Sequence, residues 1–146
     1  MRNPPRRIAT FLPAAKADVG RLHDDDPDVA RLALLKIRDL EARLVDGVTL
    51  EEMAKTGDLG DCRKLYFGPG KPPSHRIVYR HVDGDPTAIE IVEVIAIESR
   101  SDMYVYLLAA LRLGRLPAET KPHFNRVHQG VIAGRSAKRK PTPRRR

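Results

Sequence analysis

The sequence has no tryptophan, a single cysteine, and only three phenylalanines and four tyrosines in 146 residues. One cysteine, Cys62, cannot form an internal disulfide, which favours a reducing compartment and predicts a cytoplasmic protein. The longest strongly apolar stretch, residues 91–97, is interrupted by Glu93. Because a bilayer-spanning helix needs roughly 18 to 20 apolar residues, we expect no membrane association. Near the start, Pro13 and Lys16 cut short the apolar stretch that a signal peptide would need.

The remaining composition is that of one small globular domain. Hydrophobic residues make up 41% of the chain and charged residues 32%. These proportions are typical of an ordered protein with a modest core, so disorder throughout is excluded. The length suffices for one domain and leaves little room for a second.

Positive charge is concentrated at the C-terminal end. The chain carries 27 Lys and Arg against 19 Asp and Glu, and residues 121–146 hold nine of these bases and no acid. Because apolar residues are almost absent after Ile132, we expect this segment to be mobile. A polycation binds nucleic acid or an acidic protein with a strong salt dependence, although a merely solubilising end explains the charge equally well. We therefore expect a flexible N-terminus (1–5), a folded domain (6–116) and a flexible basic tail (117–146).

The first half of the domain predicts a strand followed by two helices. Residues 7–11 form a short strand candidate, and residues 14–23 a short helix. Asp26 followed by Pro27 is typical of a helix start, because the Asp caps free amides and Pro fits the first turn. An apolar stripe with residues three or four apart predicts a longer helix that Gly47 closes. The stripe consists of Val29, Ala33, Ile37, Leu40 and Leu44.

The second half predicts a sheet and a final helix. Residues 49–52 begin a one- or two-turn helix capped by Thr49, which ends at Gly57. Three strands follow, and the last of them has apolar residues on both faces, as an interior strand does. The strands cover residues 63–67, 75–82 and 89–97, and a helix covers residues 102–113. Short links make these strands antiparallel neighbours. The predicted fold is α+β in the order β-α-α-β-β-β-α, with an N-terminal helical hairpin packed on a small antiparallel sheet and a C-terminal helix.

Strand alternation places several polar side chains on one face of the sheet. If Leu65, Phe67, Ile77 and Tyr79 face the helical hairpin, the opposite face gathers cations and a phenol. The residues on that face are Lys64, Tyr66, Arg76 and Arg80. Arg100 follows the last strand and Tyr106 lies six residues later, so both can lean over one edge of this surface. Periodicity alone favours a plainer interpretation, a solvated basic face with Tyr106 packed in the core.

Other candidate sites are weaker. His23 beside the acids at positions 24–26 is explained by helix capping rather than by a cation site. His123 and His128 stand five apart with no second ligand pair, which argues against zinc. Cys62 at a strand entrance is interpreted as a small apolar residue. We expect no metal and no small-molecule cofactor.

Several short motifs are distinctive as a set because of their order and spacing across residues 8–113. They are Gly57-Asp58-Leu59, Cys62-Arg63-Lys64-Leu65-Tyr66-Phe67, Arg76-Ile77-Val78-Tyr79, residues 91–97, and Ser99-Arg100-Ser101 leading to Tyr106. Together they resemble the RelE/ParE toxin superfamily of bacterial type II toxin–antitoxin systems, nearer its RelE branch. The predicted element order is also that of this family.

The resemblance implies a ribosome-dependent endoribonuclease that cuts mRNA in the A site and thereby inhibits translation. By position, Lys64, Arg76, Arg100 and Tyr106 match the family's catalytic residues. Tyr66 departs from the pattern, because it stands where the RelE type often has a second lysine. The expected RNA-binding residues are Tyr66 and Arg80 on the sheet and Lys138, Arg139 and Lys140 in the tail. The implied partners are an acidic, partly disordered antitoxin, the ribosome and mRNA.

Metal-free RNA cleavage suits these residue types. The neighbouring 2′-OH attacks the phosphate, so the protein must accept one proton, donate another and stabilise the phosphorane. We expect Tyr106 or Lys64 to act as the base, Arg76 to stabilise the phosphorane, and Arg100 to assist the leaving group. Two alternatives share the fold: a ParE-like toxin that inhibits DNA gyrase, and an inactive relative whose basic tail binds nucleic acid.

Overall fold

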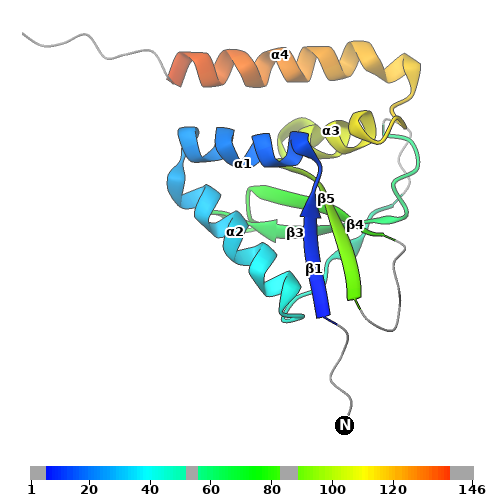
Figure 1. Cartoon of the computed structure of the whole chain (residues 1–146). Helices are drawn as coiled ribbons and strands as arrows, with labels where there is room; N and C mark the ends of the chain where they lie inside the picture. Colours follow the sequence, from blue (N-terminus) through cyan, green and yellow to red (C-terminus); the bar gives the residue numbers. More distant parts are fainter. Residues whose placement is uncertain (1–5, 52–55, 83–88, 139–146) are drawn as a thin grey trace, which may run out of the picture.

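The computed structural model describes residues 6–51, 56–82 and 89–138 (Figure 1). In these residues a five-stranded sheet lies between helices. The strands are β1 (Arg6–Phe11), β2 (Val48–Thr49), β3 (Cys62–Phe67), β4 (His75–Val82) and β5 (Ile89–Ser99). The α-helices are α1 (Pro13–Asp25), α2 (Pro27–Glu41), α3 (Tyr104–Arg112) and α4 (Lys121–Lys138), and short 3₁₀ turns span Ser101–Met103 and Ala118–Thr120. The α+β class predicted from the sequence is confirmed.

The sheet is mixed, with the strand order β1-β5-β4-β3-β2. Strands β3, β4 and β5 are antiparallel neighbours, as their short links predict. Strand β1 instead pairs in parallel with β5, with Ile8 opposite Ile91. The expectation of a wholly antiparallel sheet is therefore wrong at this edge. Link length constrains only strands that follow each other along the chain, and most of the domain separates β1 from β5.

Helices α1 and α2 cover one face of the sheet, where they form the first core cluster. This cluster contains Leu22, Ala33 and Leu40 from the helices, and Leu65, Phe67, Ile77 and Tyr79 from β3 and β4. The side chain of Asp26 accepts hydrogen bonds from the amides of Asp28 and Val29, so the predicted capping role is confirmed. Helix α2 ends at Glu41, earlier than predicted, and Leu44 lies exposed beyond it.

Val48 and Thr49 form strand β2 on the edge of β3, where the sequence predicts a short helix. Residues 52–55 of that predicted helix lie outside the described residues. Gly47 explains the local path, because a Cβ there would lie 2.8 Å from both the Lys64 carbonyl oxygen and the Tyr79 ring. Only a glycine lets the chain approach β3 and β4 this closely, and its amide donates to the Tyr79 hydroxyl at 2.7 Å.

Helix α3 covers the other face of the sheet and builds the second core cluster. Cys62, Val78 and Ala96 contribute from the strands, and Val105 and Leu108 from the helix. Strand β4 is consequently buried on both faces at residues 77–79. The buried, apolar environment of Cys62 agrees with its interpretation as a small apolar residue.

Helix α4 occupies residues for which the sequence predicts a mobile tail. It runs across α3 and the end of α1 (Figure 1), with Phe124 buried and stacked against His128. Nδ1 of His128 is hydrogen-bonded to the Tyr104 hydroxyl at 2.8 Å. Residues 139–146 of the predicted tail lie outside the described part of the chain. Among the helices of the described ranges, none is long and apolar enough to cross a bilayer.

Candidate functional site

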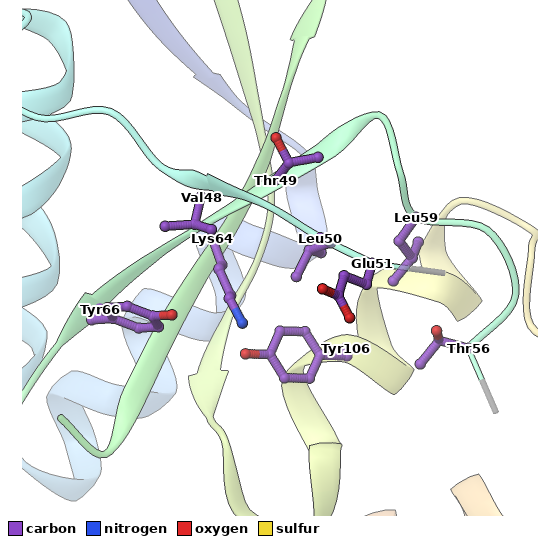
Figure 2. Close-up of a pocket in the computed structure, with 9 residues that line it drawn as sticks. All are labelled: Val48, Thr49, Leu50, Glu51, Thr56, Leu59, Lys64, Tyr66 and Tyr106. Carbon is purple, nitrogen blue, oxygen red and sulfur yellow. The ribbon is translucent and has the colours of Figure 1, made fainter. Parts of the chain in front are cut away.

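A pocket of about 190 Å³ opens where β2 and β3 meet α3 (Figure 2). Its apolar part comes from the segment around β2, and its polar groups come from β3, α3 and the chain after β2. The lining residues are Val48, Thr49, Leu50, Glu51, Thr56, Leu59, Lys64, Tyr66 and Tyr106. Three residues singled out from the sequence, Lys64, Tyr66 and Tyr106, therefore share one cavity.

Lys64 stands between the two tyrosines of the pocket. It lies two residues from Tyr66 on β3, so both side chains project from the same face of the sheet. Its Nζ is 5.7 Å from the ring centroid of Tyr66 and 5.7 Å from that of Tyr106. Lys64 makes no ion pair within the described residues, so its ammonium is available to an anion that enters the pocket.

The position of Tyr106 agrees with both interpretations that the sequence left open, a core aromatic and a site residue. It is half-buried and packs against the second core cluster, and its hydroxyl end faces Lys64 across the pocket (Figure 2). The neighbouring Tyr104 is the fully packed tyrosine of α3, where burial raises the pKa of its phenol. A core position for one edge of the Tyr106 ring is thus compatible with a phenol presented to a ligand.

Arg76 is connected to the pocket through Tyr66. The two residues are opposite each other in the β3–β4 register, and the Arg76 Cζ lies 4.1 Å from the Tyr66 ring centroid. We expect Arg76 on an outward-facing surface, but the structure buries it, with 5% of the residue exposed. Its Nη1 donates to the carbonyls of Pro73 (2.5 Å) and His75 (2.9 Å), and its buried Nε has no hydrogen-bond partner among the described residues. The flat guanidinium stacks on the phenol, and this stacking removes it from water.

Arg100 does not share the pocket with Lys64. It lines a separate, shallow hollow of about 720 Å³ beside Lys71, Ser74 and Asp102. Its amide donates to the Ser74 carbonyl at 3.0 Å, which extends the pairing of β4 and β5. The side chain is exposed and makes no hydrogen bond or ion pair within the described ranges.

The other expected RNA-binding residues lie apart from the pocket. Arg80 is four positions along β4 from Arg76 and is neutralised by Glu93 on β5, with 3.0 Å between Nη2 and Oε1. The cross-strand register brings these two side chains together, which strand alternation within β4 does not reveal. The side chains of Lys138, Arg139 and Lys140 lie outside the described residues.

Sequence reasoning missed Glu51 as a site residue. Figure 2 shows its carboxylate beside the Tyr106 ring, where it is the only acid that lines the pocket in the described chain. The sequence offers no periodic signal for this position, because it follows a two-residue strand that was itself predicted as helix. The pocket thus contains an ammonium, two phenols and a carboxylate, groups that can exchange protons with a bound substrate.

Comparison with known proteins gives one structural resemblance to report. No protein family model matches the sequence, and no curated protein matches it. Among solved structures, a match is found to a double arginine-to-alanine mutant of the E. coli toxin RelE in the free state. This chain is similar to RelE. The TM-score is 0.49 at 18% sequence identity, with 72% of this chain and 95% of the RelE chain covered. Groups of three or more His, Cys, Asp or Glu arranged to hold a metal ion do not occur among the described residues.

Proposed function

We propose that this protein is the toxin of a type II toxin–antitoxin system, a ribosome-dependent endoribonuclease that cleaves mRNA in the A site. The observation that carries the proposal is the pocket in which Lys64 and Tyr106, from different elements, face each other. Both positions match catalytic residues of the RelE pattern that the sequence resembles. A lysine that forms no ion pair with the described residues and stands beside a phenol suits a ribose-phosphate link, which offers a negative charge and a proton to remove.

The chemistry begins with the ribose 2′-OH as nucleophile. Its proton passes to Tyr106 acting as the phenolate or to Lys64 acting as the neutral amine, and the Glu51 carboxylate, which also lines the pocket, is a second acceptor. As the 2′-oxygen bonds to phosphorus, the Lys64 ammonium stabilises the negative charge of the phosphorane. The 5′-oxygen then leaves with the proton that the accepting group returns to it, and the products are a 2′,3′-cyclic phosphate and a 5′-hydroxyl. Each positioned proton-transfer group contributes roughly 10² to 10⁴ in rate.

The two arginines serve different parts of the RNA in this proposal. Arg76, held against the Tyr66 ring, supplies positive potential to the phosphate in the pocket. Arg100, in its separate hollow with Lys71, binds the backbone on one side of the cleaved link. For Arg100 we therefore propose binding of the RNA backbone instead of the assistance to the leaving group that the sequence led us to expect.

An antitoxin partner follows from the same proposal. Three leucines on the outer side of α2, Leu32, Leu34 and Leu35, are each more than two-fifths exposed. An amphipathic helix of an acidic, partly disordered partner can cover such leucines while its acidic segments reach the basic surfaces. The complex and the free toxin are both expected in the cytoplasm, where ribosomes and mRNA are found.

The test is to add the purified protein to ribosomes programmed with a defined mRNA and to map new 5′ ends by primer extension. We expect ends within the A-site codon, and no cleavage of the same mRNA without ribosomes. A parallel assay measures DNA supercoiling by gyrase. If the mRNA stays intact and supercoiling is blocked, the protein is a ParE-like gyrase inhibitor and the proposal is wrong. If the mRNA stays intact and gyrase remains active, the protein is a nucleic-acid-binding relative without nuclease activity.

A further inference from the structure

Arg135 of α4 binds Glu98, the acidic residue that lies opposite Arg76 on the neighbouring strand. Glu98 on β5 is opposite Arg76 in the β4–β5 register, and opposed residues of antiparallel strands project from the same face. Glu98 is fully buried. The Nη2 of Arg135 lies 2.7 Å from each of its carboxylate oxygens. The Nε of Arg135 also binds Asp25 at 2.9 Å, which joins α4 to the end of α1.

Whether Arg76 forms an ion pair depends on this arrangement. A buried carboxylate opposite a buried guanidinium ordinarily pairs with it, because each charge is costly to leave uncompensated. Arg76 nevertheless makes no ion pair in the described residues, and its Nε lacks any partner. Burial raises the pKa of Glu98, and the hydrogen bonds and charge of Arg135 oppose that rise. Both oxygens of the Glu98 carboxylate are thus engaged by Arg135 of α4.

We propose that Arg135 is a positioning residue, which engages Glu98 and thereby keeps the Arg76 guanidinium available to an RNA phosphate. This inference rests on the proposed nuclease function. It assigns α4 a part in the reaction although none of the described side chains of the helix lines the pocket. Without Arg135, Glu98 pairs with Arg76 across the strands, and the positive potential beneath Tyr66 is lost.

The decisive experiment compares single and double variants in the ribosome cleavage assay. We expect Arg135→Ala to lower kcat roughly tenfold to hundredfold, less than the loss of a group that contacts the phosphorane, because Arg76 acts through its positive potential. Arg135→Ala combined with Glu98→Gln should recover most of that activity, because the competing charge is gone. A role of Arg135 in stability alone predicts that the double variant is no more active than the single one, and that result overturns the proposal.

A second measurement does not depend on nuclease activity. The Nε–Hε resonance of Arg76, observed by NMR on ¹⁵N-arginine-labelled protein, reports a new carboxylate partner as a changed shift and slower hydrogen exchange. We expect that change in Arg135→Ala and its reversal in the double variant. An Arg76 resonance that is identical in wild type and Arg135→Ala overturns the inference. If wild type cleaves no mRNA yet the resonance changes as expected, the proposed function fails while the charge arrangement stands.

Discussion

Tyr66 decides how two cations are held at the candidate site. Its ring centroid lies 5.7 Å from the Lys64 Nζ and 4.1 Å from the Arg76 Cζ. The ring offers an aromatic face to both cations. Attraction of cations to that face keeps Arg76 stacked and folded back towards the carbonyls of the preceding turn.

We predict that this role depends on the ring and not on the hydroxyl. Tyr66→Phe keeps the stacking, so its cleavage rate should stay within about threefold of wild type, whereas Tyr66→Ala should lose roughly tenfold. Single-turnover cleavage of ribosome-bound mRNA measures both. Equal losses in the two variants would show that the phenolic hydroxyl, and not the stacked ring, is what the site needs.

The burial of Cys62 leads to a separate prediction about the reactivity of its thiol. Burial raises the pKa of its thiol to about 11, so the reactive thiolate is scarce near neutral pH. We expect a thiol-specific disulfide reagent at pH about 8 to label the native protein at least a hundredfold more slowly than the urea-unfolded chain. Rapid labelling of the native protein would contradict the burial of this strand entrance.

At the scale of elements, sequence reasoning succeeded where signals are local. The Asp26–Pro27 pair set the start of α2, and short links set the antiparallel order of β3, β4 and β5. It failed where an element depends on distant partners. Strand β2 exists because Gly47 lets the chain approach β3, and α4 is fixed by Arg135 contacts with α1 and β5. Neither partner is identifiable from composition or periodicity.

Glu90 ties together three elements and makes the stability of the fold depend on pH. It binds Arg7 of β1, Arg43 after α2 and His81 of β4. Burial alone would raise the pKa of Glu90, but the hydrogen bond from Arg7 and the charges of all three partners outweigh it, so the pKa is lowered. A carboxyl with a lowered folded-state pKa stabilises the fold above its unfolded pKa and loses that contribution as pH falls through the folded value.

We therefore predict that Glu90→Gln flattens the acid side of the stability profile. Urea midpoints of wild type should fall more steeply than those of the variant between about pH 6 and about pH 3, and the two proteins should converge at the acid end. Glu119→Gln, at an exposed position in the turn before α4, is the matched control and should follow wild type. Parallel curves for wild type and Glu90→Gln would exclude Glu90 as the source of the pH dependence.

For the whole molecule, the candidate site was only partly predictable. Strand alternation placed Lys64 and Tyr66 on one face, and the position of Tyr106 after the last strand placed it at an edge of that face, where the pocket brings the three together. The burial of Arg76 and the separate hollow of Arg100 depend on stacking and on the path of the turn before β4. Such features arise from tertiary packing, so one sequence does not reveal them.

The distribution of charge predicts how the molecule binds RNA. Residues 139–146 contain five Lys or Arg and no acid. Removing them, and leaving α4 complete, should reduce the slope of log affinity against log salt for single-stranded RNA by about 0.7 for every phosphate that these bases neutralise. Fluorescence anisotropy with a labelled oligonucleotide measures the slope. An unchanged slope would show that these bases bind no phosphates.

The most direct test of the account is the cleavage rate of variants at the pocket. Lys64→Ala and Tyr106→Phe are compared with wild type on programmed ribosomes, with Lys16→Ala at an exposed position of α1 as the control. The account predicts that the two pocket variants cleave about a hundredfold or more slowly, with unchanged thermal midpoints and a fully active control. Wild-type rates in both Lys64→Ala and Tyr106→Phe would contradict it, because the cleavage would then take place elsewhere on the protein.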